Sequence, residues 1–241
     1  MEVPFLWSIS AEKANINNTT RRCVNNILRA GSLVKPSLKN GKWKLRIISQ
    51  AVTQADLKNL AMKSALEGLF ELTVISLNSG ENIYSAADLS KIQKNAAVAG
   101  NLKLVKYIYD QFGNHDLETG NVLIAAAEKG RLRVVKYLIK KFQYTYRNNA
   151  QELSRALFVA SCYGRLKVVM FLIDNFEYDK GDVNGSLIGA SYSGQLNIVK
   201  YLVMKGADIH CKIHGQSPLD EAASQRHFNI VRFLLEAQEE G

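Results

Sequence analysis

The sequence is poor in the residues from which disulfide frameworks and most catalytic sites are built. Its 241 residues include three cysteines, Cys23, Cys162 and Cys211, and only four histidines. An odd number of widely spaced cysteines argues against disulfides and favours a reducing compartment, so we expect a cytoplasmic protein. No apolar run approaches the roughly 20 residues that span a bilayer. Residues 1–7 lack a basic leader and a long apolar run, so we expect no secretory signal, although export by a dedicated secretion machine would not need one.

Short catalytic and metal-binding motifs are missing as well. There is no phosphate-cradling glycine loop, no paired-carboxylate motif and no nucleophile elbow. His210, Cys211 and His214 form a His-Cys-x-x-His cluster, but it lacks the nearby fourth ligand that structural zinc requires. Cys162 has no histidine close in sequence, which favours a partly buried structural thiol over a nucleophile. We therefore expect no catalytic residues, no metal and no cofactor.

Positive charge is present in excess and is unevenly distributed. The formal net charge is +9. Residues 1–50 carry nine basic and two acidic side chains, and residues 91–180 carry 15 basic and eight acidic ones. The two remaining segments are slightly acidic. Any acidic partner would therefore meet the N-terminal segment or the middle of the chain.

A periodic pattern begins near Asp56. Turn positions recur at intervals of 32, 30, 34, 30 and 32 residues, close to the 33 of one known repeat class. A small residue precedes each turn by four positions, and an apolar residue follows it by two. This coincidence at fixed offsets indicates six helix-turn-helix units. The turn positions are Gly68, Gly100, Gly130, Gly164, Gly194 and Arg226.

The clearest unit lies within residues 187–235. Leu196, Val199 and Leu202 give one apolar helical face, and Gly206 can end that helix in the left-handed conformation. Ser217 can cap the next helix, with Pro218 at its first position. The segments Gly206-Ala207-Asp208 and Ser217-Pro218-Leu219-Asp220 resemble the Gly-Ala-Asp loop and the Thr-Pro-Leu-His entry of ankyrin repeats. The divergent upstream units resemble those of amoeba-infecting giant viruses and intracellular bacteria.

This resemblance implies an all-α ankyrin-repeat solenoid of about six helix-turn-helix units. One such unit cannot bury its own apolar surface, so stacking on like units is required. We expect the array to occupy residues 54–241 and residues 1–53 to form a non-repeat segment that caps it, or alternatively a small separate functional element. Within that segment, residues 18–31 indicate a helix. The alternation in residues 42–47 indicates a strand, or less well the second helix of a decayed repeat.

The resemblance also implies a concave partner surface, formed by the two positions before each turn glycine and by the loop tips. Tyr163 and Tyr192 would then be neighbours on adjacent units, and tyrosine is enriched among binding hot spots. The alternative is that some of these rings only pack between repeats. The candidate partner-binding residues are Glu128, Lys129, Tyr144, Tyr146, Tyr163, Tyr178 and Tyr192.

A second candidate surface is basic. Arg133, Lys136 and Lys140 share one helical face, and stacking would align them with lysines of the neighbouring units. A solvated helix row that keeps the protein soluble is the simpler interpretation. The alternative is an acidic protein surface, nucleic acid or anionic membrane as partner. The basic ridge comprises Lys103, Lys106, Arg133, Lys136, Lys140 and Lys167.

These patterns predict a monomeric, non-enzymatic module that captures a partner protein on its concave surface. The viral and bacterial style of the repeats suggests a pathogen product that acts on a host protein in the host cytoplasm. Electrostatic binding through the ridge and the basic N-terminal segment is the alternative. A catalytic or targeting element within residues 1–50 is a third, weaker hypothesis.

Overall fold

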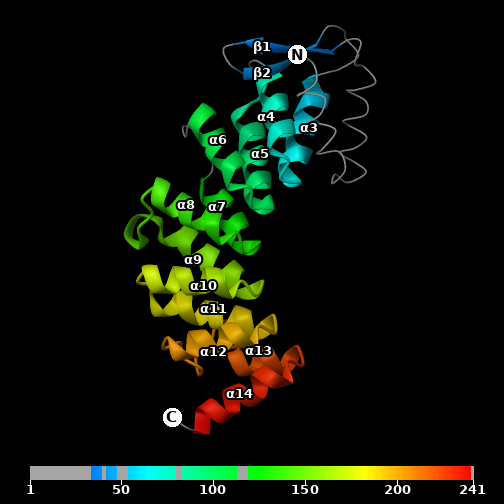
Figure 1. The fold of residues 1–241 in the computed structure, drawn as a ribbon. Helices are drawn as coiled ribbons and strands as arrows, with labels where there is room; N and C mark the ends of the chain where they lie inside the picture. Colours follow the sequence, from blue (N-terminus) through cyan, green and yellow to red (C-terminus); the bar gives the residue numbers. More distant parts are fainter. Residues whose placement is uncertain (1–33, 40–41, 48–53, 80–82, 113–118, 240–241) are drawn as a thin grey trace. The chain divides into compact units, whose positions relative to one another are not determined.

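A computed structural model describes residues 34–39, 42–47, 54–79, 83–112 and 119–239 (Figure 1). The chain divides into two compact units, residues 1–118 and residues 119–241. The helix expected at residues 18–31 lies outside the described residues.

The described residues of the first compact unit, residues 1–118, form two strands and two helix pairs. Strands β1 (Val34–Lys39) and β2 (Lys42–Ile47) pair antiparallel, and β2 packs against helix α4. The strand interpretation of residues 42–47 is therefore confirmed, whereas the capping role of residues 1–53 and the boundary after residue 53 stay predictions. The helix pairs are α3 (Gln54–Leu66) with α4 (Phe70–Ser79), and α5 (Ala86–Ala99) with α6 (Leu102–Phe112).

Residues 119–241 contain four helix pairs stacked in sequence order (Figure 1). First helices pack on first helices and second helices on second helices. An isolated bridge between Ile213 and Gln216 marks the hairpin between α12 and α13. The pairs are α7 (Thr119–Glu128) with α8 (Leu132–Lys141), α9 (Tyr146–Cys162) with α10 (Leu166–Asn175), α11 (Lys180–Tyr192) with α12 (Leu196–Met204), and α13 (Pro218–Ser224) with α14 (Phe228–Glu239).

All six predicted turn positions have a left-handed backbone, with φ between 60° at Arg226 and 82° at Gly100. In each pair the amide after the turn donates to the carbonyl four residues before the turn, as from Gln195 to Ala190 at 2.9 Å. The residue that bears this carbonyl is fully buried in every pair, because the neighbouring first helix approaches it closely. These six residues are Ser64, Ala96, Ala126, Ala160, Ala190 and Ala222. The six-unit, all-α architecture predicted from the periodicity is thus confirmed.

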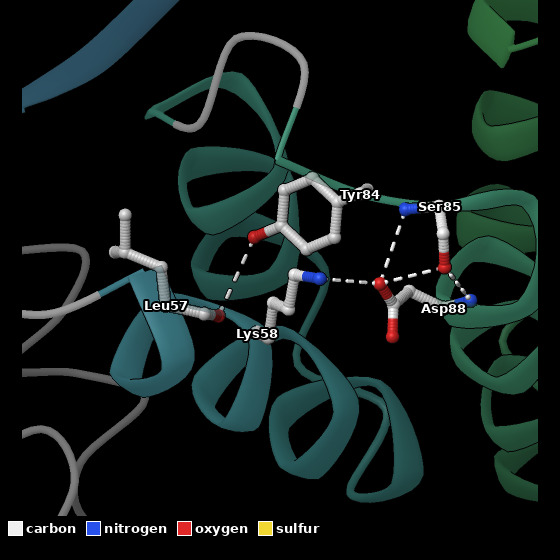
Figure 2. Close-up of polar contacts among 5 residues, drawn as sticks. All are labelled: Leu57, Lys58, Tyr84, Ser85 and Asp88. Atoms are coloured by element: carbon white, nitrogen blue, oxygen red, sulfur yellow. Dashed lines mark hydrogen bonds and ion pairs between the residues drawn. The ribbon is translucent and has the colours of Figure 1, made fainter.

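Tyr84, which lies just before helix α5, joins adjacent repeats within residues 1–118 (Figure 2). The Tyr84 hydroxyl lies 2.9 Å from the Ser76 carbonyl oxygen and 3.4 Å from that of Leu57, and burial raises its pKa. Next to it, Ser85 caps α5 and forms a capping box with Asp88. Lys58 of α3 donates to the same Asp88 carboxylate at 2.7 Å. These contacts connect the start of α5 to the preceding repeat.

The Asp88 carboxylate makes stability depend on pH. Its hydrogen bond from Lys58 lowers its pKa from 3.8 to about 2. Because the folded-state pKa is depressed, its stabilisation is complete above the ordinary pKa and is lost as pH falls toward the folded-state value. We expect Asp88→Asn to lower the free energy of unfolding at pH 7, and this deficit to shrink as pH falls below 4. Urea denaturation across pH measures it. Lys58→Met should give the same pH dependence, and a deficit constant from pH 7 to 3 would contradict this assignment.

Gly194 is expected to tolerate a side chain less well than Gly206. Both have positive φ, 74° and 89°, a conformation that costs an L-residue about 1–2 kcal/mol. A Cβ at Gly206 would meet no atom within 4 Å, whereas one at Gly194 would lie 2.7 Å from the His227 ring. Gly194→Ala should therefore lose roughly 1 kcal/mol more than Gly206→Ala, because the ring must move and its hydrogen bond breaks. Urea unfolding of both variants tests this; equal losses would contradict the close approach.

Candidate protein-binding surface

The first helices of residues 119–241 expose three aromatic side chains close to their C-terminal ends. The helices α7, α9, α11 and α13 pack side by side in that order. Their buried faces carry the small residues that allow close approach. Tyr163 is 52% exposed, Tyr192 51% and Phe158 45%. We call Glu128, Lys129, Phe158, Tyr163 and Tyr192 the first-helix surface.

Lys129 connects the polar and aromatic parts of this surface. Its ammonium lies 2.7 Å from a Glu128 carboxylate oxygen and 5.7 Å from the centre of the Tyr163 ring. Arg165, in the turn of the next repeat, donates from Nε to the Glu128 carbonyl at 2.8 Å. The end of α7 is therefore joined to the α9–α10 turn through both side chain and backbone. Because these contacts fix Lys129 beside the ring, the predicted residues Glu128, Lys129 and Tyr163 lie together.

Phe158 is a candidate that the sequence analysis missed. It lies on α9 and packs over Gly189 of α11: a Cβ placed there would be 2.8 Å from the ring and equally close to the Cys162 sulfur. The glycine thus lets the ring approach the next helix closely, while Phe158 remains 45% exposed. The sequence contained one signal for this contact, Gly189, because a glycine inside a helix often marks the close approach of a neighbouring group.

Tyr192 stands at the C-terminal end of α11, where its backbone is fixed. His227 Nε2 donates to the Tyr192 carbonyl at 2.9 Å, from the turn of the following repeat. The Tyr192 ring is exposed and can contact a partner. In residues 1–118, Asn101 likewise follows a turn and contacts the preceding one, with its side-chain amide donating to the carbonyl of the turn residue Gly68 at 2.7 Å. The residue after the turn therefore supports the preceding turn at several repeats.

Tyr144 and Tyr178 are not exposed loop tips, which corrects the expectation from sequence. Tyr144 is only 7% exposed, and its hydroxyl donates to Thr119 Oγ1. The Tyr178 hydroxyl approaches the Leu153 carbonyl, and burial raises its pKa well above the ordinary value. Each tyrosine directly precedes a capping residue, as Tyr84 does. Because Tyr144 is buried and Tyr178 is half-buried between repeats, we exclude both rings from the candidate site.

Tyr146 also has a structural partner. Its hydroxyl donates to the Asp182 carboxylate, which Ser154 also approaches, and its ring packs edge-on against Tyr178 with centroids 5.3 Å apart. The hydrogen bond to Asp182 raises the Tyr146 pKa. Tyr146 is half-buried at the start of α9. This cluster joins α9 to α11, so we assign Tyr146 to repeat packing and leave it out of the first-helix surface.

The predicted basic ridge is divided between the two units. Lys103 belongs to residues 1–118 and lies 3.9 Å from both a Glu71 carboxylate oxygen and the centre of the Phe70 ring. Lys106 is in the same unit. Arg133, Lys136 and Lys140 lie exposed on α8, and Lys167 lies exposed on α10. Of the six predicted residues, only Arg133, Lys136, Lys140 and Lys167 therefore lie on helices that pack against each other within one compact unit.

The described residues contain free thiols but no cluster of metal-ligating side chains. No three His, Cys, Asp or Glu side chains converge there on a position for a metal ion. Cys162 and Cys211 are free thiols, and burial raises the pKa of each, which disfavours the thiolate form. No helix in this part of the chain is long and apolar enough to cross a membrane.

Stacked helix pairs with left-handed turns define the class of α-helical repeat solenoids. The family model of ankyrin repeats in three copies matches residues 94–185 and 182–240, more than half of the chain, so the chain belongs to the ankyrin repeat family. It is 26% identical over 121 residues to an ankyrin repeat protein of Acanthamoeba polyphaga mimivirus. That match covers 45% of this chain and 19% of the viral protein, so the chain spans about a fifth of that relative's length. Ankyrin repeats typically serve as protein-interaction modules, and the predicted family is confirmed.

The buried and exposed tyrosines should differ sharply in their effect on stability. Removing a buried aromatic ring costs about 3–5 kcal/mol, whereas exposed substitutions usually stay within about 0.5 kcal/mol. We expect Tyr178→Ala to fall near the lower end of the first range, because the ring is only partly enclosed, and Tyr192→Ala to fall in the second. Urea denaturation followed by circular dichroism measures both. Similar losses for the two variants would refute the distinction between packing and surface tyrosines.

Proposed function

We propose that this protein captures a partner protein on the first-helix surface of residues 119–241. The observation that carries the proposal is the exposure of Phe158, Tyr163 and Tyr192 on adjacent first helices whose backbones are fixed by packing. Exposed aromatic side chains on a rigid support contribute large contact area at a low cost in conformational entropy. Glu128 and Lys129 add a polar edge beside Tyr163. Such a combination of aromatic centre and polar rim is typical of protein interfaces.

The proposed activity is binding without catalysis, by a monomer in a reducing compartment. The raised thiol pKa values of Cys162 and Cys211 support a structural role for these cysteines. Their free state is compatible with a cytoplasmic location. The similarity to a protein of an amoeba-infecting virus supports a finer proposal, in which the partner is a host protein and the chain acts inside the host cell.

Removing the three aromatic side chains should abolish capture without unfolding the protein. We expect the variant Phe158→Ala, Tyr163→Ala, Tyr192→Ala to lose partners that the wild-type protein retains from host-cell lysate, as identified by mass spectrometry. For a partner identified in this way, titration calorimetry should show an affinity at least 30-fold weaker, because hot-spot residues contribute about 2 kcal/mol or more.

The matched control removes three exposed apolar side chains from the second helices: Met204→Ala, Phe228→Ala and Leu235→Ala. This variant should keep the same partners and affinity. Equal capture by the wild-type protein and the first-helix variant, with unchanged helical content, would show that the binding surface lies elsewhere.

A further inference from the structure

We propose that the exposed face formed by Arg133, Lys136, Lys140 and Lys167 binds the phosphate backbone of double-stranded nucleic acid without sequence preference. We call these four residues the α8–α10 basic face. This activity is separate from protein capture, because it uses the second helices of the repeats and none of the residues of the first-helix surface.

Helix α8 concentrates positive charge without internal compensation. Its sequence Leu132–Lys141 contains four basic residues and no acidic one. Arg133, Lys136 and Lys140 are spaced three and four residues apart, so they share one side of the helix, and all three are exposed. Lys167 lies exposed at the start of α10, which packs beside α8. In the described part of this unit, the ion pairs Lys129–Glu128, Lys205–Asp174 and Arg232–Glu236 involve none of these four residues.

Two acidic groups on the second helices of this unit, Asp174 and Glu236, already have basic partners. Asp174 on α10 accepts hydrogen bonds from Lys205 at 2.8 Å and from Tyr201 at 2.9 Å, and these hold its pKa below the ordinary value. Glu236 on α14 lies 3.8 Å from Arg232. Both carboxylates therefore have positive charges closer than the α8–α10 basic face. Because neither of these carboxylates neutralises the α8–α10 basic face, an external polyanion can supply the complementary charge.

The basic face is also partly fixed in place. Lys136 lies over the Phe171 ring of α10, with its ammonium 5.0 Å from the ring centre. Arg133 and Lys140 are seven residues apart, which is about 10 Å along the helix axis. Neighbouring helices are about 8–10 Å apart. Because a duplex carries one charge per roughly 1.7 Å of its axis, a patch of this size faces several phosphates at once.

The same face fits single strands and membranes less well. Proteins that bind single strands stack bases on exposed aromatic rings. On α8, α10 and α12, however, none of the exposed large apolar residues is aromatic. Stable attachment to a membrane needs an apolar signal besides the basic one. The exposed apolar residue on α10 is Met170, at 40% exposure, which offers a small area for insertion. Backbone contact to a duplex requires charge alone.

The test is a fluorescence-anisotropy titration of the whole protein with a labelled 24-base-pair DNA duplex of arbitrary sequence, from 30 to 200 mM salt. Four phosphate contacts predict a slope of log K against log salt of about −3.6. We expect the variant Arg133→Gln, Lys136→Gln, Lys140→Gln to reduce this slope by about 2.7 and to weaken binding at the lowest salt. A second duplex of unrelated sequence should bind equally well.

The control variant removes the same number of charges elsewhere in the same unit, at exposed residues outside both surfaces: Lys180→Gln, Lys212→Gln and Arg232→Gln. This control variant should retain most of the slope of log K against log salt.

Equal effects of the two variants on duplex binding would overturn the proposal, because the binding would then depend on net charge alone. Absence of duplex binding by the wild-type protein at 30 mM salt would also overturn it. Tighter binding to vesicles containing phosphatidylserine, to single-stranded DNA or to polyglutamate than to the duplex would overturn the choice of partner. Urea unfolding verifies that both variants fold, and protein capture should be unaffected in the α8 variant.

Discussion

The left-handed turn between the two helices of each pair is the constraint on which the rest of this structure depends. It ends the first helix, and its backbone hydrogen bond returns to a fully buried small residue four positions earlier. That small residue permits first helices to approach closely, while the turn directs the second helix onto its own layer. Even Arg226 adopts this conformation, with φ of 60°, although an L-residue is disfavoured there by about 1–2 kcal/mol. Retention of the turn without glycine indicates that its geometry is imposed by the packing of α13 and α14 against each other and against the preceding repeat.

Close packing of the turns leaves the segments between repeats to be stabilised in another way. Only the connection between α12 and α13 has a hairpin bridge within the described residues. At three other connections a tyrosine before the capping residue packs against the preceding repeat, buried at Tyr144 and half-buried at Tyr84 and Tyr178. A buried ring supplies apolar area, and its hydroxyl satisfies a polar group that would otherwise lack a partner. These tyrosines therefore take over part of the role of the missing hairpins.

The repeat architecture could be predicted from the sequence, because turn, small residue and apolar residue recur at offsets that the backbone geometry fixes. The candidate surface could be predicted only in part. Tyr144 and Tyr192 are the same amino acid, and a tyrosine is compatible with either a packed or an exposed position. Only its place relative to the capping residue separates the two cases, and that signal recurs too few times to be recognised without the structure. Likewise, the pairing of Asp174 with Lys205 depends on which side chains meet between repeats, which periodicity does not specify.

The two helix layers hold the repeats together by different interactions, and this difference explains why the layers can present different chemistry. First helices meet largely through small buried residues, apart from the Tyr146–Asp182 cluster at the start of α9, so the large side chains at their exposed positions add little to stability. Second helices meet through larger groups: the Tyr107 hydroxyl donates to Asn78, Tyr201 donates to Asp174, and Lys200 lies over Phe233. Lysines and aromatic rings there stabilise the stack and also give its surface a charge. Aromatic residues for partner recognition can therefore change on the first helices without disturbing the fold, whereas the charge of the second helices is more closely tied to stability.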